Sequence, residues 1–372
     1  MTTAGRFVGV MSGTSIDAVD AVLVRIDGNQ VNVEASHSAD IPDNLRADII
    51  RLCAPGEDHI DLLGRTDRAL GLLFADTVQA LLSRYRLAAG EITAIGSHGQ
   101  TIRHRPSPGG GVTHFSLQIA DANTIAAVTG ITTVADFRRK DMARGGQGAP
   151  LLPAFHQAAF YRSGEHRAVV NLGGIANVTW LGASGDVRGF DTGPANGLMD
   201  AWCQRHLNLP YDEDGRWAAQ GSVDQSLMDA LLAHPFLAKL PPKSTGREDF
   251  NIRWLDSVLA GLPREPSPKD VQATLALFTA RTVADNLTMA EHTPKKVILC
   301  GGGALNRHLA ALIAAESGLA VVSSAELGID PRRVEGAGFA WMARQTLAGL
   351  PSALASVTGA DRDSVLGGIY YP

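Results

Sequence analysis

Short apolar segments rich in β-branched residues alternate with polar turns at the start of the chain. The apolar stretches are residues 7–11, 21–26 and 31–35, and the pair Asp27 and Gly28 separates the last two. Asp-Gly between two apolar runs is a strong signal for a tight hairpin turn. The pattern predicts three adjacent antiparallel strands.

A helical pattern follows over residues 44–87. Apolar side chains recur there at helical spacings, at Leu63, Leu70, Phe74, Val78, Leu81 and Tyr85. This spacing places them on one face of a helix that packs against a core. Strands are then predicted at 92–96, 115–119 and 132–135, with Asp121 capping a short helix. The first half of the chain is therefore predicted to be α/β.

The opening pattern that begins at Arg6 begins again at Arg167. Three strands are predicted at 168–172, 177–181 and 187–190, with a Gly173-Gly174 turn between the first two. Helices at 196–207 and 272–287 and a buried strand at 297–300 are predicted to follow. Glycines 301–303 then lead into a helix that carries Leu305, Leu309, Leu312 and Ile313.

Two similar α/β halves favour a duplicated architecture that forms a cleft. The chain has 372 residues, which is more than one hydrophobic core usually organises. We expect residues 1–135 with 352–372 to form the first lobe, and residues 136–351 to form the second.

Charge and composition exclude several classes of protein. There are 33 Lys and Arg against 38 Asp and Glu, a formal net charge of −5, so no basic field favours nucleic acid or anionic lipid. No apolar run approaches the roughly 20 residues that span a bilayer, and no secretory signal is legible at the start. We expect a soluble cytoplasmic protein with no nucleic-acid or membrane partner. Cys53, Cys203 and Cys300 lie far apart and are expected to be reduced core thiols.

Gly13, Thr14 and Ser15 come directly after a predicted buried strand. Their N–H and O–H donors suit the approach of an anionic phosphate. The chain has no Gly-Lys dipeptide, so this is not a Walker loop, and it has no GxGxxG for a dinucleotide. A plain hairpin turn in which Thr14 bonds locally is the alternative.

Two further features close strands of the second half. Asp191 stands after residues 187–190 beside small residues, which suits a general base or a metal partner, or else an Asp that caps a turn. Glycines 301–303 offer bare backbone on which a purine or ribose could lie, although strand-to-helix turns often need glycine. Together with the Gly13 loop they are typical of nucleotide-binding folds with two duplicated lobes.

Longer motifs extend this likeness over nearly the whole chain. They are GVMSGTSIDAVD (9–20), GSHGQTIRH (96–104), ADFRRKDMARGGQGAPL (135–151), NLGGIANVT (171–179), GFDTGPANGLMDAW (189–202), PKSTGREDFN (242–251), ILCGGGALN (298–306) and VEGAGFAWMA (334–343). In these stretches the sequence resembles the anhydro-N-acetylmuramic acid kinases. That family belongs to the superfamily of acetate and sugar kinases, heat-shock ATPases and actin, so the resemblance implies a duplicated, two-lobed, actin-like ATPase fold with nucleotide between the lobes.

The resemblance implies an ATP- and Mg²⁺-dependent enzyme of cell-wall (peptidoglycan) recycling. Such an enzyme opens the 1,6-anhydro bridge of the amino sugar anhydro-N-acetylmuramic acid and phosphorylates O6, giving N-acetylmuramic acid 6-phosphate and ADP. A homodimer is possible.

Site residues follow from the same motifs. Asp191 falls on the family's catalytic base. The ATP-phosphate loop covers Gly13, Thr14, Ser15, Ile16, Asp17, Ala18, Val19 and Asp20. Gly173, Gly174, Gly301, Gly302 and Gly303 are assigned to ATP. The residues assigned to the sugar are His98, Gln100, Asp136, Arg138, Arg139, Asn177 and Glu335. The family usually has glycine at the positions of Ala18 and Ala195, where a methyl group is expected to crowd the phosphates.

Several of these residues have a second interpretation. Asp17 is a metal-water ligand or an acidic residue that favours a helix N-terminus. Arg138, Arg139 and Lys140 form a basic group that either binds the lactyl carboxylate of the sugar or makes a solvated corner. His98 and His104 lack metal-ligand companions, so a hydrogen-bonded loop role is favoured. Glu335 touches sugar hydroxyls or favours a helix dipole.

Two other functions stay open at this point. The fold permits a kinase for another small sugar or acid. An ATP-dependent conformational or binding protein is the alternative of a different class, and the sequence speaks against it because no separate peptide-binding domain is visible.

Overall fold

The computed structural model describes residues 4–13, 15–28, 30–54, 56, 59–106, 114–241, 243–246, 249–288 and 292–372. The chain divides into two compact units. The first is Met1–Ala159 with Arg333–Pro372, and the second is Phe160–Arg332. Residues 136–159 and 333–351, which the sequence had assigned to the second lobe, thus lie in the first unit.

A seven-stranded mixed sheet organises the first unit, in the order β12-β6-β4-β1-β2-β3 with β5 paired to β4. The three predicted strands at the start form an antiparallel meander, and β4 and β6 add to it in parallel. The bounds are β1 Gly5–Ser12, β2 Ala18–Asp27, β3 Gln30–Asp40, β4 Ala94–Arg105, β5 Phe115–Ile119, β6 Thr133–Ala135 and β12 Gly368–Tyr370.

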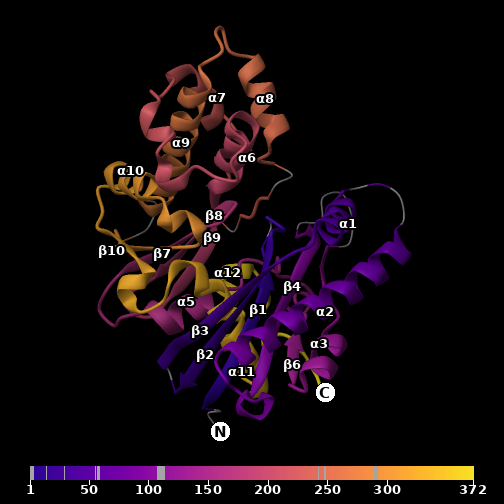
Figure 1. The fold of residues 1–372 in the computed structure, drawn as a ribbon. Coiled ribbons are helices and arrows are strands. Elements are labelled where there is room, and N and C mark those ends of the chain that lie inside the picture. The colour runs from indigo at the N-terminus through magenta and orange to yellow at the C-terminus, as the bar shows by residue number, and fades with distance from the viewer. Residues whose placement is uncertain are drawn as a thin grey trace. The chain divides into compact units, whose positions relative to one another are not determined.

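One face of this sheet is covered by α11 (Val334–Leu347), which explains why these residues join the first unit (Figure 1). The helix lies unusually close to the strands. A Cβ added at Gly9 would stand 1.8 Å from the Gly336 carbonyl oxygen, and one at Gly96 would stand 2.0 Å from that of Phe339. Only glycine on the two central strands permits this approach.

The predicted helical stretch 44–87 is two helices, α1 (Asp43–Cys53) and α2 (Ile60–Arg84). Leu70, Phe74, Val78 and Leu81 are buried as predicted, but Tyr85 lies beyond the helix and is exposed. The other helices of this unit are α3 (Ala122–Thr129), α4 (Arg139–Met142), α5 (Pro153–Phe160) and α12 (Ala355–Thr358). Asp121 caps α3 as expected, because its side chain accepts from the Asn123 amide.

The second unit repeats the same strand order. Its five-stranded sheet runs β11-β10-β7-β8-β9, with an antiparallel β7-β8-β9 meander and β10 and β11 added in parallel. The bounds are β7 Arg167–Leu172, β8 Ile175–Leu181, β9 Val187–Pro194, β10 Lys296–Cys300 and β11 Val321–Ser323. The first unit has β3-β2-β1-β4-β6 in the equivalent places, so the duplicated architecture is confirmed. β4 and β8 also differ from their predicted bounds, and β9 continues past its predicted end at residue 190 to Pro194, so Asp191 lies within it.

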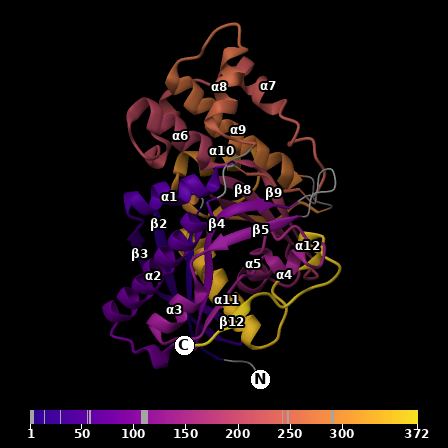
Figure 2. The ribbon, with the colours of Figure 1, turned by 90° about the vertical axis from the view of Figure 1, so that its right-hand side faces the viewer.

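Helices α6 to α9 gather into a bundle beside the second sheet, as both views show (Figures 1 and 2). The helices are α6 (Asn196–Leu207), α7 (Gln225–Leu232), α8 (Ile252–Ala260), α9 (Pro268–Thr288) and α10 (Arg307–Ser317). The sequence predicted α6 at its observed bounds and missed α7 and α8. Leu305, assigned to the last helix, lies in a separate 3₁₀ turn (Gly302–Leu305) and is half exposed.

In the part of the chain that the structure describes, no helix combines the length and apolar character needed to cross a membrane. Cys203 and Cys300 are buried and Cys53 is half-buried, and all three are reduced thiols, as expected.

Candidate functional site

The loop after β1 holds the first candidate phosphate ligands. The Ile16 amide donates to the Gly13 carbonyl oxygen at 3.2 Å, which closes a tight turn. Ile16 has a φ of 56° although its side chain is β-branched and buried. Such a conformation costs about 1–3 kcal/mol and is concentrated at functional sites. Thr14 lies outside the described residues.

Asp17 ends this loop. Its Oδ1 accepts from the Ser15 hydroxyl at 2.5 Å and from the Ala18 amide at 3.0 Å. No helix follows, because β2 begins at Ala18, so the interpretation of Asp17 as a helix N-terminal residue is wrong. These bonds fix the carboxylate at the mouth of the loop.

The last three residues assigned to the phosphate loop belong to β2. Val19 is buried in the hydrophobic core of the unit, and Asp20 accepts a hydrogen bond from the Ser38 hydroxyl on β3. Their backbone pairs with β1 and β3. The described residues of the loop that lie outside β2 are therefore Gly13 and 15–17.

His98 and Arg138 meet where β4 carries an irregularity opposite β1. Arg138 Nη2 lies 2.9 Å from His98 Nε2, and its Nη1 donates to the Gly148 carbonyl oxygen at 2.7 Å. His98 Nδ1 lies 3.0 Å from the Gly99 carbonyl oxygen, and its ring packs on Phe339 of α11. Burial, followed by the charge of Arg138, lowers the pKa of His98 to about 3. His98 is thus a neutral hydrogen-bonded side chain.

His104 is also neutral and hydrogen-bonded. Its Nδ1 lies 3.1 Å from the Ser116 hydroxyl on β5, and burial, followed by the charges of Arg138 and Arg105, lowers its pKa to about 4. The expectation of a hydrogen-bonded role is confirmed, although both histidines lie on a strand instead of a loop.

The remaining sugar candidates of the first unit lie on separate elements. Asp136, with φ of 62°, accepts from Arg139 Nε at 2.7 Å directly after β6. Gln100 is buried on β4, and within the described residues its Oε1 has no hydrogen-bond partner. Glu335 lies in the first turn of α11, as the sequence predicted.

In the second unit a polar row crosses three strands. Asn171 on β7 pairs with Asn177 on β8, which pairs with Asp191 on β9. Paired residues share a face, and the hydrophobic core takes their neighbours Val170, Leu172, Val178 and Phe190 on the other face. The Asp191 Oδ2 accepts from the Thr245 amide at 2.9 Å, and the Asp191 amide donates to the Lys243 carbonyl oxygen at 3.1 Å. The structure thus brings Asn177 and Asp191 together and fixes the carboxylate.

Both glycine turns of this unit lie at the carboxyl ends of neighbouring strands. The Gly173 and Gly174 carbonyls accept from the first amides of the α6 region, among them Asn196 N at 2.9 Å. Asn196 Nδ2 donates to the Leu172 carbonyl oxygen at 2.8 Å, and a Cβ at Gly303 would lie 2.8 Å from the same side chain. The two turns and the start of α6 are therefore one packed cluster.

The three glycines at 301–303 differ from one another in how closely other atoms surround them. At Gly301, φ is 80° and a Cβ would lie 2.3 Å from Asn171 Oδ1. At Gly302 nothing lies within 4 Å of that position. Gly302 therefore presents bare backbone to open space, as a surface for a flat ligand requires.

Sequence reasoning missed Lys243 and Thr245 as site residues. Both stand in the motif at 242–251, which was noted only for its resemblance. Their contacts with Asp191 span more than 50 positions of the chain, so no local pattern reveals them. Lys243 is a lysine with 5% of its surface exposed, and such burial is rare for an unpaired charge.

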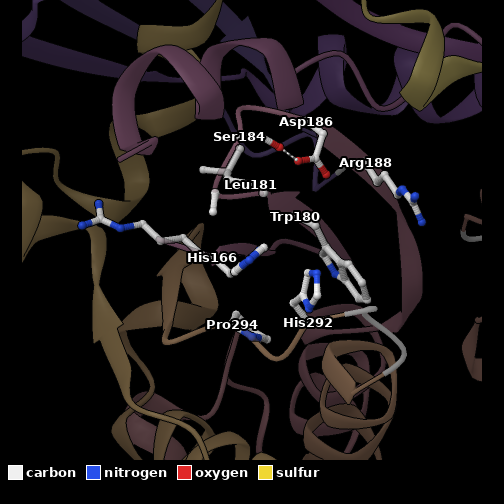
Figure 3. A pocket seen from close by; sticks show the side chains of 11 residues that line it. His166, Trp180, Leu181, Ser184, Asp186, Arg188, His292 and Pro294 are labelled. Carbon is white, nitrogen blue, oxygen red and sulfur yellow. Dashed lines mark hydrogen bonds between the residues drawn. The ribbon is translucent and has the colours of Figure 1, made fainter. Parts of the chain in front are cut away.

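A cavity of about 400 Å³ in the second unit lies apart from these residues (Figure 3). It is lined at the amino ends of β7 and β10 by His166, Trp180, Arg188 and His292, with the His166 and His292 rings 4.7 Å apart. The glycine turns lie at the opposite, carboxyl ends of the same strands. None of the residues assigned to the site from the sequence lines this cavity.

The repeated strand order defines the class of fold, an α/β architecture with two mixed sheets of the actin-like type. Component A of the (R)-2-hydroxyglutaryl-CoA dehydratase from Acidaminococcus fermentans is similar in fold, with a TM-score of 0.50, 10% identity, and coverage of 93% of this chain and 100% of that one.

Sequence comparison identifies the family. The family model described as anhydro-N-acetylmuramic acid kinase matches residues 5–372. The anhydro-N-acetylmuramic acid kinase of Shewanella pealeana is 50% identical over 367 residues, covering 98% of each chain, and that of Shewanella oneidensis is 49% identical, covering 97% of each. The chain belongs to the anhydro-N-acetylmuramic acid kinase family, a family of ATP-using kinases.

Proposed function

We propose that this kinase opens the 1,6-anhydro bridge of anhydro-N-acetylmuramic acid with water and transfers the γ-phosphoryl group of ATP to O6. The products are N-acetylmuramic acid 6-phosphate and ADP, and the reaction serves peptidoglycan recycling in the cytoplasm. Family membership supports the substrate. The observation that carries the chemistry is the fixed carboxylate of Asp191 in the polar row of the second unit.

Asp191 acts as the general base. A water molecule attacks C1 and gives its proton to the carboxylate, while O6 leaves C1 and takes the phosphoryl group. The Thr245 amide bonded to Oδ2 and the backbone bond to Lys243 hold the carboxylate in one orientation. Asn177, its cross-strand neighbour, binds the sugar on the same face.

The phosphates of ATP are bound by the loop at residues 13–17. Gly13 and the exposed Ser15 follow directly after a buried strand, a position at which anions are commonly bound by backbone amides. Gly173, Gly174 and glycines 301–303 form the nucleotide surface of the second unit, with Gly302 as its open face.

Mg²⁺ is proposed as the metal, and Asp17 as the residue that holds it. Among the described residues no group of three or more His, Cys, Asp or Glu side chains could hold a metal ion. A single carboxylate still fits, because Mg²⁺ is usually bound by one or two carboxylates together with substrate phosphates. Bound there, the ion would neutralise charge on the transferred group. The bonds from Ser15 and Ala18 orient the Asp17 carboxylate for this purpose.

The sugar is bound in the first unit by His98, Gln100, Asp136, Arg138, Arg139 and Glu335. Arg138 is the best candidate for the lactyl carboxylate, because its contacts with His98 and Gly148 fix the guanidinium in place. A fixed guanidinium matches a carboxylate better than a mobile one.

ADP release across a panel of anhydro and ordinary amino sugars tests the proposed substrate. We expect rapid release with anhydro-N-acetylmuramic acid and little with N-acetylmuramic acid or N-acetylglucosamine. Release that is independent of any sugar, or that responds to polypeptide, would contradict a sugar kinase.

A further inference from the structure

Lys243 carries a buried positive charge that is attracted to the carboxylate of Asp191. The side chain is 5% exposed, and taking an ammonium group out of water is costly unless another charge or dipole compensates. Burial lowers the pKa of Lys243, and attraction to Asp191 acts in the opposite direction. The two groups therefore interact electrostatically.

Backbone contacts fix the two residues against each other. The Lys243 carbonyl oxygen accepts from the Asp191 amide at 3.1 Å. Thr245 lies two positions after Lys243, and its amide donates to Asp191 Oδ2 at 2.9 Å. Thr245 is itself held, because its hydroxyl donates to Asp249 Oδ2 at 2.7 Å. One short segment thus supplies a hydrogen bond to the carboxylate and carries the ammonium group.

The surroundings of the ammonium group keep it in place. Lys243 Nζ lies 5.1 Å from the ring centre of Phe236 and 5.8 Å from that of Phe190, the residue before Asp191. Its hydrogen-bond acceptor is the Leu237 carbonyl oxygen at 3.4 Å. Aromatic faces attract a cation without neutralising it. With little water present, the attraction between this charge and a neighbouring carboxylate is weakly screened.

We propose that Lys243 is a positioning residue for catalysis, which keeps the Asp191 carboxylate ionised and oriented as the general base. The inference rests on the proposed role of Asp191. Coulombic attraction is mutual. Because the Asp191 carboxylate stabilises the Lys243 ammonium, the ammonium also stabilises the ionised form of Asp191.

Three other titratable groups lie near Lys243 and Asp191, and the charge of each determines how it affects the Asp191 carboxylate. Asp249 approaches from the Thr245 side and its negative charge opposes the effect of Lys243. Lys239 stacks on Phe236 from an exposed position, 5.8 Å from the ring centre. His234 packs on Phe250, and burial lowers its pKa, so it is neutral at neutral pH. Of these described groups, Lys243 is the one that is both positively charged and buried.

The pH profile of kcat/KM tests the proposal in three variants. Lys243→Met removes the charge and keeps the length of the side chain, so the acid limb should move to higher pH by about one unit or more, with a fall in kcat. Lys243→Arg should keep the limb near its wild-type position. Lys239→Met, the matched control on the same ring, should move nothing. An unchanged acid limb in folded Lys243→Met would overturn the proposal.

NMR of ¹⁵N-labelled lysine side chains supplies a test that does not need Lys243 to be replaced. The titration of the Lys243 ammonium is followed in the wild type and in Asp191→Asn, with Asp249→Asn as the comparison. We expect a lower midpoint in Asp191→Asn, because the attraction is lost. An unchanged midpoint would refute the coupling. Activity retained by Asp191→Asn would instead refute the proposed base, and the two failures are thus distinguishable.

Discussion

The two meanders share one strand order but differ at the turn that joins their first two strands. Between β1 and β2 the chain spends five residues, 13–17, in a loop with a left-handed Ile16 and a carboxylate at its end. Between β7 and β8 it uses only Gly173 and Gly174, and the start of α6 bonds to both carbonyls. In the first turn the Ser15 hydroxyl and the Ile16 amide bond within the loop, whereas in the second turn both glycine carbonyls accept from the start of α6.

We infer that the two turns suit different tasks. The longer turn of the first unit suits the phosphates, because the groups that neighbouring residues bind there, the carbonyl oxygens of Ser15 and Asp17, are acceptors and not donors. In the second unit, the strands joined by the short turn carry Asn171 and Asn177, which form the polar row with Asp191 on the next strand. Substitutions in each unit should therefore have different signatures.

The largest effect is expected at Asp191. Asp191→Asn should bind ATP and sugar nearly normally while kcat falls by about 10²- to 10⁴-fold, the usual contribution of a general base. Calorimetric titration and steady-state kinetics on the same preparation separate the two effects. Turnover like that of the wild type would remove Asp191 from the mechanism.

Arg138 should decide recognition of the lactyl group in the first unit. A charge-assisted hydrogen bond contributes about 1.5–3 kcal/mol, so Arg138→Ala should lower the preference for anhydro-N-acetylmuramic acid over anhydro-N-acetylglucosamine about 10- to 150-fold. Arg139→Ala should change this ratio less, because Arg139 is exposed and paired with Asp136. If both sugars lose equally in both variants, the basic group is a solvated corner.

Substitutions at two neighbouring glycines of the second unit should affect different quantities, stability at Gly301 and ATP binding at Gly302. Gly301→Ala meets Asn171 and the Leu172 carbonyl at a left-handed φ, so it should lower the free energy of unfolding by about 1–3 kcal/mol. Gly302→Ala meets nothing and should leave stability unchanged while raising the KM for ATP. Thermal unfolding and kinetics give both quantities. A stable Gly301→Ala, or a Gly302→Ala with normal KM, would contradict the assignment.

Gly13 provides the counterpart in the open loop. A Cβ there would have the Ser15 hydroxyl at 3.8 Å as its nearest neighbour, so Gly13→Val should fold. Loss of one or two phosphate hydrogen bonds should weaken ATP about 5- to 50-fold and sugar much less. Calorimetry that finds ATP affinity unchanged would show that this loop does not bind phosphate.

The smallest effect concerns acid stability. The pKa values of His98 and His156 are lowered to about 3 and that of His104 to about 4, all chiefly by burial in the first unit. The unfolded chain binds protons near pH 6.5 that the folded chain does not. Stability should therefore be full above pH 6.5 and fall as the pH drops towards 4.

His98→Gln sharpens this last prediction. The new amide oxygen can still accept from Arg138 but gains no proton, so the melting temperature should fall less steeply below pH 6.5. A slope equal to that of the wild type would rule out a contribution from His98.

The regular elements were predictable because their signals are local. The Asp27-Gly28 turn, the spacing of Leu70, Phe74 and Val78, and the recurrence at Arg167 identified both halves and their duplication. The same three-strand pattern appears once in each half of the sequence, and each copy forms the meander of one sheet. The duplicated α/β fold could therefore be predicted from the sequence. The break between α1 and α2 was missed, although the pair Pro55 and Gly56, a strong helix-breaking signal, stands between them in the sequence.

Long-range contacts were not predictable in this way. The assignment of α11 to the first unit depends on the close approach of Gly336 to Gly9, which no spacing along the chain reveals. The same holds for Lys243 and Thr245 beside Asp191. Asp191 was singled out from the sequence, because a carboxylate among small residues near a strand end suits a general base and the family motif surrounds it, and its role stays a prediction.

The fate of solvent oxygen tests the proposed reaction most directly. An anhydro sugar has no free O6 until the bond between C1 and O6 breaks, so water must supply the new anomeric hydroxyl. Turnover in ¹⁸O-water, with immediate reduction of the product to prevent anomeric exchange, should place the label at C1 and leave the C6–O–P bridge unlabelled. Label in the bridging oxygen would mean attack at C6, and label only in free phosphate would mean separate hydrolysis of ATP. Either result would contradict the role assigned to Asp191.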